Sequence, residues 1–200
     1  MSKLRLTTFA FFILSFINNI SGQITFSNIN VNLKIGQSNK LTQLTCSNAT
    51  LSYKFELNHT VTMMQNKNFV KIDSQLIQIT PLQVGGYKKP PGTLDTAQQR
   101  QFLENYAQYE LDYMKNELKV EIINLNSQWV ISKSRGWFIW YFRPKLSLPE
   151  LNKQTEIQLF ASTILGDKIL TINAPMQTGD NFGKAAYIVN DLMESLKIDR

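Results

Sequence analysis

The sequence has few of the residues on which enzyme and metal sites most often depend. It holds one histidine, His59, and one cysteine, Cys46, among its 200 residues. A zinc site with two histidine ligands is therefore excluded within this chain. A single cysteine can form no internal disulfide, so the fold must be stabilised by a hydrophobic core, which a chain of this length is able to bury.

Several catalytic and binding motifs are also missing. No Gly-x-Ser-x-Gly sequence marks a nucleophilic serine. The Val84-Gly85-Gly86-Tyr87 segment lacks the Lys-Ser/Thr pair and the helix start of a phosphate loop, and no acidic calcium loop is present. Glu104, Glu110 and Glu117 fall mostly on the polar side of a predicted helix, where we expect solvent to cover them. We therefore predict no catalytic residue, no cofactor and no metal.

The charge of the chain gives no indication of nucleic-acid binding. The formal net charge is +6, and removal of Lys3 and Arg5 with the N-terminal segment lowers the basic count from 21 to 19 against 15 acidic residues, a net charge of +4. The cations are scattered, and only Lys88 and Lys89 are adjacent. No basic and aromatic stripe of the kind that binds nucleic acid is visible.

Residues 1–22 have the three parts of a secretory signal peptide. Lys3 and Arg5 precede the apolar run 6–17, and small residues follow at Ser21 and Gly22. Cleavage after Gly22 would leave residues 23–200 as the mature protein. We expect the protein to be exported, to the periplasm or the cell exterior.

An uncleaved membrane anchor and a buried N-terminal helix are the alternatives for the same segment. A spanning helix needs roughly 20 consecutive apolar residues, and polar Asn18 and Asn19 interrupt this run earlier. The later apolar run 137–142 is too short to span a membrane. We therefore expect a single domain over residues 23–200 with no stable membrane anchor.

The first part of this domain predicts short strands. Apolar and polar residues alternate in each of the stretches, as they do in half-buried strands. The expected strands are 24–35, 51–57, 69–72 and 76–79. The expected loops are the polar stretch that runs through 36–39 and 46–48, and the segment 84–92.

A long helix is predicted over residues 93–119, which contain no glycine or proline after the start. Leu103, Ala107, Leu111, Met114 and Leu118 recur at spacings of three and four and should face a sheet. A second stripe holds Tyr106, Tyr109 and Tyr113, together with Phe102. These tyrosines either flank the buried face or form a binding strip for a partner or ligand.

The remaining residues predict a meander of strands and a closing helix. Strands are expected at 120–122, 129–131, 137–142, 155–165 and 168–173, with turns at 124–127 and 133–136. Residues 137–142 are apolar at both odd-numbered and even-numbered positions, which indicates a strand covered on both faces. Gly166-Asp167 favours a tight hairpin. The last helix has a cap at 178–180 and ends near residue 198, with Phe182, Ala185, Val189, Leu192 and Met193 on its apolar face.

The C-terminal half resembles a known fold family. The carrying residues are Ile157–Phe160, Gly166–Pro175 and Ala186–Lys197, ending in Glu194-Ser195-Leu196-Lys197. They are similar to the Mog1/PsbP-like fold, of which secreted bacterial relatives exist. The resemblance implies an α+β sandwich: an antiparallel sheet with a long central helix and a C-terminal amphipathic helix packed on it. A cystatin-like or NTF2-like sheet is the second candidate, although the helix after Pro175 disfavours it.

The resemblance implies an accessory or binding protein that acts through a protein partner and is not an enzyme. The surface that we predict for a partner or ligand consists of Tyr87, Lys88, Lys89, Tyr106, Tyr109, Tyr113, Trp137 and Trp140. One alternative is a carrier of a small apolar ligand, with a cleft bordered by Trp137 and Trp140. The other is a hydrolase with a cysteine or serine nucleophile, in which Cys46 and His59 would be partners.

Overall fold

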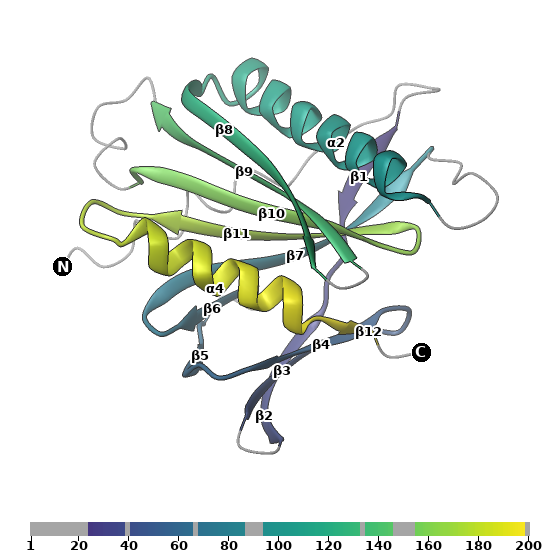
Figure 1. Cartoon of the computed structure of the whole chain (residues 1–200), viewed down its shortest axis with the longest axis vertical. Helices are drawn as coiled ribbons and strands as arrows, with labels where there is room; N and C mark the ends of the chain where they lie inside the picture. Colours follow the sequence, from purple (N-terminus) through teal and green to yellow (C-terminus); the bar gives the residue numbers. More distant parts are fainter. Residues whose placement is uncertain are drawn as a thin grey trace.

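The computed structural model describes residues 24–38, 41–65, 68–86, 94–132, 135–145 and 155–198 (Figure 1). The predicted signal segment 1–22 lies outside these residues. So do Tyr87, Lys88 and Lys89 of the predicted binding surface. Within the described part of the chain, neither helix is long and apolar enough to cross a membrane.

The described strands form two antiparallel sheets. The larger sheet has the order β5-β6-β7-β11-β10-β9-β8, and β1 pairs with β7. It contains β1 (Thr25–Asn28), β5 (Val61–Met63), β6 (Phe69–Ile72), β7 (Gln75–Gly85), β8 (Glu121–Ser132), β9 (Arg135–Lys145), β10 (Ile157–Leu165) and β11 (Lys168–Met176). The smaller sheet has the order β12-β4-β3-β2 and contains β2 (Asn32–Ser38), β3 (Leu41–Ser47), β4 (Ser52–Leu57) and β12 (Lys197–Ile198).

Helix α2 (Thr96–Asn116) covers one face of the larger sheet (Figure 1). A capping box starts the helix: Gln98 N donates to Asp95 Oδ1 at 2.8 Å, and Asp95 N donates to Gln98 Oε1 at 3.1 Å. The helix predicted over 93–119 is thus confirmed with shorter ends. Its buried face includes Leu103, Ala107, Leu111 and Met114, as the spacing predicted.

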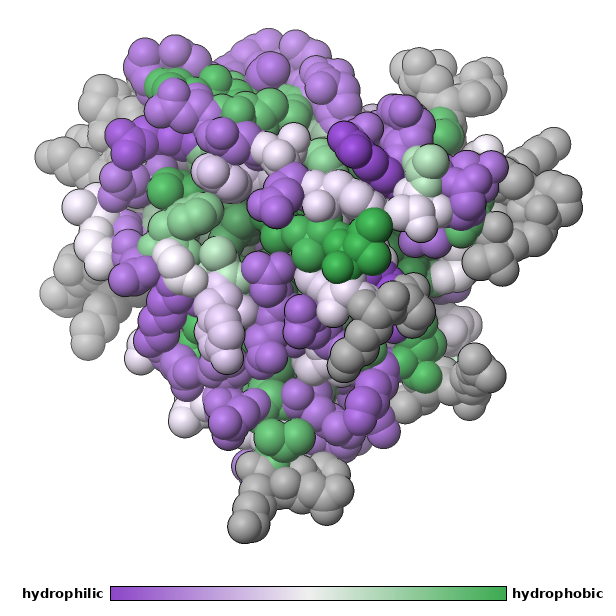
Figure 2. Space-filling view, viewed as in Figure 1, coloured by the Kyte–Doolittle hydropathy of each residue, from purple (hydrophilic) through white to green (hydrophobic). Residues whose placement is uncertain are grey.

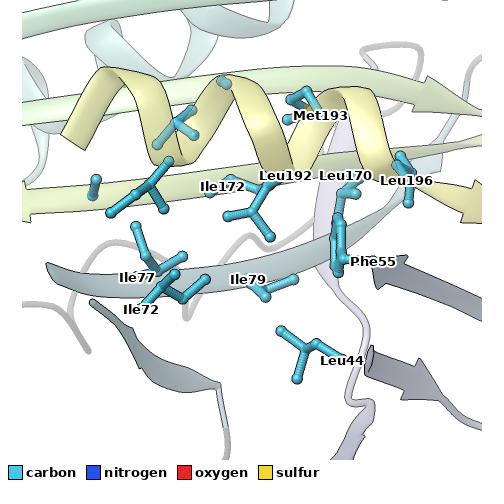
Figure 3. Close-up of a cluster of buried hydrophobic side chains, with 14 of the residues drawn as sticks. Leu44, Phe55, Ile72, Ile77, Ile79, Leu170, Ile172, Leu192, Met193 and Leu196 are labelled. Carbon is cyan, nitrogen blue, oxygen red and sulfur yellow. The ribbon is translucent and has the colours of Figure 1, made fainter. Parts of the chain in front are cut away.

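Helix α4 (Phe182–Ser195) covers the opposite face of the larger sheet. Its N-cap is Asn181, whose side chain accepts a hydrogen bond from Lys184 N at 3.0 Å, rather than a residue of the predicted cap at 178–180. Figure 3 shows its side chain Leu192 on the side of Ile172 of the larger sheet and of Phe55 and Leu44 of the smaller sheet. One hydrophobic core therefore joins α4, the larger sheet and the smaller sheet.

The two faces of β9 belong to different cores, which explains its apolar sequence. Trp137 and Ile139 belong to the core under α4, whereas Phe138, Trp140 and Phe142 belong to the core under α2. The prediction of a strand covered on both faces is confirmed. The Gly166-Asp167 hairpin is also confirmed, because Leu165 pairs with Lys168 and Gly166 has φ of 66°.

Several predictions of elements were wrong. The last helix does not reach residue 198, because α4 ends at Ser195 and Lys197–Ile198 form β12. The single strand expected at 24–35 is divided into β1 and β2, which belong to different sheets. The polar segment read as loop contains β3, with Cys46 on its inward face. The turn expected at 124–127 lies inside β8, where a bulge between Ile123 and Asn126 interrupts the register and Asn124 has φ of 55°.

Candidate functional site

The predicted tyrosine strip on α2 is largely part of the core. Tyr106 is 1% exposed, and its hydroxyl accepts a hydrogen bond from Thr171 Oγ1 at 3.1 Å. Phe26 of β1 packs against both Tyr106 and Tyr109 with ring centroids 4.9 Å apart in each case. Tyr109 and Tyr113 are half-buried. Tyr106 is therefore corrected from a surface residue to a core residue, since β1 covers it.

Trp137 and Trp140 do not line a common cleft. Both are 1% exposed, and they lie on opposite faces of β9. The Trp137 indole N–H donates to Asn190 Oδ1 of α4 at 3.0 Å, whereas Trp140 stacks on Phe160 with centroids 4.1 Å apart. Their placement as a binding surface is thus corrected, because two residues three apart on a strand point to opposite sides.

A surface groove of about 400 Å³ lies at one end of strands β8, β9 and β10, and charged side chains contribute to its lining. Ion pairs connect Arg143 with Glu156 at 2.8 Å and Lys145 with Glu121 at 2.7 Å. Its lining consists of Ile123, Arg143, Pro144, Lys145, Thr155, Glu156 and Thr178. Neither tryptophan takes part in it, so this groove is not the predicted aromatic cleft.

Cys46 is unsuited to nucleophilic attack. It is fully buried in β3, and this burial raises the pKa of its thiol to about 12. The neighbouring Tyr53 hydroxyl also has a pKa well above its ordinary value, mainly because it is buried. A thiol with this pKa stays protonated at neutral pH, and the thiolate is the reactive form.

His59 lies between two carboxylates from distant parts of the chain. Its Nδ1 is 2.6 Å from Asp73 Oδ2, in the turn between β6 and β7, and its Nε2 is 3.2 Å from Asp191 Oδ2 of α4. The side chain of His59 is 8% exposed, and Nε2 makes no aligned hydrogen bond. The residues of this His59 cluster are His59, Asp73 and Asp191.

The His59 cluster is built to hold elements together. Thr60 N also donates to Asp73 Oδ1 at 2.9 Å, and Lys184 Nζ donates to the Asp73 carbonyl at 2.6 Å. The hydrogen bond from His59, followed by that from Thr60 N, lowers the pKa of Asp73. Both imidazole nitrogens face carboxylates, so neither faces a nucleophile. In the described part of the chain no group of three His, Cys, Asp or Glu side chains could hold a metal ion.

Glu110 is a buried acid that the sequence reading placed on the solvated side of the helix. It is 5% exposed, and burial raises its pKa to about 7, against a smaller lowering by the Tyr106 hydroxyl. Thr171 links Tyr106 onward to Ser162 Oγ at 3.0 Å. The spacing in the sequence does indicate this burial, because Glu110 follows Ala107 by three residues and precedes Met114 by four, which places it on the buried face of the helix.

The outer edge of β8 carries a row of apolar side chains that sequence reasoning missed. Leu125 is 46% exposed and Ile131 is 58% exposed, with the half-buried Trp129 between them. Trp129 pairs with Phe138 and Ile131 pairs with Gly136, so their side chains lie on the α2 side of the sheet. Leu125 adjoins the bulge, directly before the regular part of the strand, and has the same parity as Trp129 and Ile131. We call the free edge of β8 with these three side chains the β8 surface.

Local sequence explains why this row is exposed. Gly136 offers Ile131 no side chain across the strand pair, and the bulge at Ile123 and Asn126 separates Leu125 from a regular partner in β9. A compact hydrophobic patch is visible in Figure 2 at the place where one end of β8 lies in Figure 1. Exposed apolar groups of this kind mark interaction sites when they lie together.

Comparisons with known proteins bear on the fold. No family model and no curated protein matches the chain. Among solved structures, the chain is similar to the solution structure of cyanobacterial PsbP (CyanoP) from Synechocystis sp. PCC 6803. The TM-score is 0.46 and the sequence identity 10%, over 78% of this chain and 92% of that chain. The likeness is to a PsbP-like fold, the fold that the C-terminal residues resemble. It concerns the fold alone.

Proposed function

We propose that this chain is an exported accessory protein that is not an enzyme and acts by binding a protein partner. The predicted signal segment 1–22 supports export to the periplasm or the cell exterior. The partner binds at the β8 surface. Catalysis receives no support from the two residues with the most reactive side chains, since Cys46 is a buried thiol and His59 is held between carboxylates.

The observation that carries this proposal is the exposure of Leu125 and Ile131 along a strand whose outer edge is free among the described residues. A free strand edge offers a partner unpaired backbone N–H and C=O groups, and the apolar row offers side-chain contact. The largest side chain of the row, Trp129, is of the type that contributes most to the affinity of protein interfaces.

The test is a partner capture with residues 23–200 as bait, from native envelope and culture supernatant. A bait with Leu125→Lys and Ile131→Lys is compared with the unchanged bait and with Ile35→Lys, which alters a 37% exposed residue of β2. We expect a stoichiometric protein to be retained by the unchanged bait and by the Ile35 variant, and to be lost from the β8 variant. Retention of that protein by the β8 variant contradicts the proposal. So does a bait that captures neither another protein nor a second copy of this chain.

The export part of the proposal is tested separately. Expression of the full chain in a bacterial host, followed by N-terminal sequencing of the fractionated protein, should give a mature start at or next to Gln23 in the periplasm or medium. An intact Met1 terminus in the cell interior or the membrane contradicts export.

A further inference from the structure

The edge formed by β8 differs from every other sheet edge in the described part of the chain. β8 runs from Glu121 to Ser132, whereas the opposite edge of the larger sheet is formed by the short strands β5, with three residues, and β1, with four. In the smaller sheet, β12 has two residues and contains Lys197, and β2 contains Lys34. Short length and lysine are the usual protections of an edge against pairing with another chain.

β8 has none of these protections over most of its length. Residues 122–132 contain no charged residue and no proline. The bulge lies near the start of the strand, so residues 126–132 remain in regular register with β9. A regular strand of this kind presents its outer N–H and C=O groups in the arrangement that a second strand pairs with.

The β8 sequence is complementary to itself when two copies run antiparallel. A two-fold axis at Gln128 pairs residues 126–130 of the two copies and brings Ile131 of one copy beside Leu125 of the other, the residue that adjoins the bulge, and the same contact occurs twice. These are the most exposed apolar residues of the strand, at 46% and 58%. Directly opposite side chains on one face approach within roughly 4.5–5.5 Å between Cβ atoms, so each apolar side chain would cover the other.

The charges of the strand agree with this pairing. Because residues 122–132 are uncharged, the antiparallel copies bring no like charges opposite each other. Glu121, at the start of the strand, already pairs with Lys145 of β9 at 2.7 Å. The central residues Asn126 and Gln128 are exposed and polar, so they can remain hydrated at the contact at little cost in free energy.

We infer that the partner of the β8 surface is a second copy of this chain, joined by antiparallel pairing of β8 with β8 around Gln128. The inference rests on the proposed function, because it names the protein that binds at the proposed surface. The paired edges continue the larger sheets of two subunits into one, and the apolar rows of both copies are buried at the junction. A two-fold contact of this type is closed, so it produces a dimer and not a fibre.

The first experiment measures the mass of the mature chain, residues 23–200, by native mass spectrometry and by light scattering over a dilution series. We expect twice the monomer mass at high concentration and a shift towards the monomer on dilution. The variant with Leu125→Lys and Ile131→Lys is expected to stay monomeric, because it places cations opposite each other. The Ile35→Lys variant should dimerise as the unchanged chain does, and circular dichroism verifies that both variants fold.

The second experiment tests the register. Gln128→Cys places two cysteines at the two-fold axis, where directly paired Cα atoms are close enough for a disulfide. Mild oxidation should give a covalent dimer, and the buried Cys46 should remain unmodified. Asn126→Cys is the matched control: it is exposed on the same strand but lies opposite Val130 of the second copy, so it should give no cross-link. Cross-linking of both variants to the same extent overturns the register.

The outcomes separate this inference from the proposed function. A chain that is monomeric at every concentration, and whose Gln128→Cys variant does not cross-link, overturns the inference. If that chain still captures a different protein through Leu125 and Ile131, the proposed function stands without it. If the chain is monomeric and captures nothing through β8, both fail. A dimer that persists in the Leu125→Lys and Ile131→Lys variant also overturns the inference, because another surface must then form it.

Discussion

The indole ring of Trp129 lies directly against the backbone of Gly136 on the neighbouring strand, so that a Cβ at Gly136 would overlap the ring. Trp129 reaches this position from β8, diagonally across the β8 and β9 pair, in which it is opposite Phe138. The glycine thus allows the tryptophan to lie flat on the sheet beside the exposed Ile131. This contact determines the shape of the β8 surface.

Gly136→Ala is therefore expected to displace the Trp129 ring. Overpacking at such a contact costs about 1–3 kcal/mol of folding free energy, and we expect the emission of the displaced indole to shift towards that of solvated tryptophan. Chemical denaturation and fluorescence measure the two effects. Gly36→Ala is the matched control, since a Cβ on that strand residue meets nothing within 4 Å. Equal effects of both substitutions would contradict the close contact.

Glu110 makes the stability of the fold depend on pH. Its pKa is raised from 4.5 to about 7 in the folded protein. The protonated Glu110 makes its full contribution to the free energy of unfolding below pH 4.5, and this contribution is lost as the pH rises through about 7. The shift corresponds to roughly 3 kcal/mol of folding free energy.

Glu110→Gln should remove this dependence, because an amide keeps the polar contact to Tyr106 without a titrating proton. Unfolding free energies measured from pH 4 to pH 9 should fall for the unchanged chain relative to this variant. Glu104→Gln is the control, since Glu104 is on the solvent side, where it pairs with Arg100 at 2.7 Å. A parallel pH dependence in the unchanged chain and in Glu110→Gln would contradict the buried, raised acid.

Elements that depend on local pattern were predictable from the sequence. Residues 137–142 are apolar on both parities and form the doubly covered β9, and Gly166 supplies the positive φ of the hairpin. Strand β3 was missed because polar Thr42 has the parity of the buried Leu44 and Cys46 while apolar Leu41 has the other parity, which hides the alternation. Local composition favoured a loop there, but pairing with β2 and β4 overrides it.

The relationships between distant residues could not be predicted in the same way. His59, Asp73 and Asp191 meet only because α4, the β6–β7 turn and the chain after β4 are brought together by the fold. The exposure of Ile131 likewise depends on the register that places Gly136 opposite it. Periodicity identifies the buried face of an element but not the neighbour that covers it. The candidate surface was therefore assigned first to tyrosines and tryptophans that other strands and helices bury.

His59 is expected to be the reason for the low pKa of Asp73. A carboxyl whose folded-state pKa lies below 3.8 contributes stability above that pH, and loses the contribution as the pH falls through the lower folded-state value. His59→Gln should return the pKa of Asp73 towards its ordinary value, because the hydrogen bond from His59, the main cause of the lowering, is weakened. Titration of the Asp73 carboxyl by NMR measures the change. An Asp73 pKa that is unaltered in His59→Gln, with Thr60 N still donating, would contradict this assignment.

Cys46 is expected to be inert in the native protein and reactive only after unfolding. Its thiol is buried in β3 with a pKa raised to about 12, so the thiolate fraction at neutral pH is very small. Iodoacetamide at pH 8 should leave the native chain unmodified, and should alkylate Cys46 fully in denaturant, as read by intact mass. The rate in intermediate denaturant should follow the unfolded fraction. Rapid native modification would instead show an accessible, activated thiol, and would return the hydrolase alternative to consideration.

Cys46→Ala keeps the buried position apolar and distinguishes a reactive role of Cys46 from a core role. A reactive role predicts loss of an activity, whereas a core role predicts a loss of about 1–2 kcal/mol in stability alone.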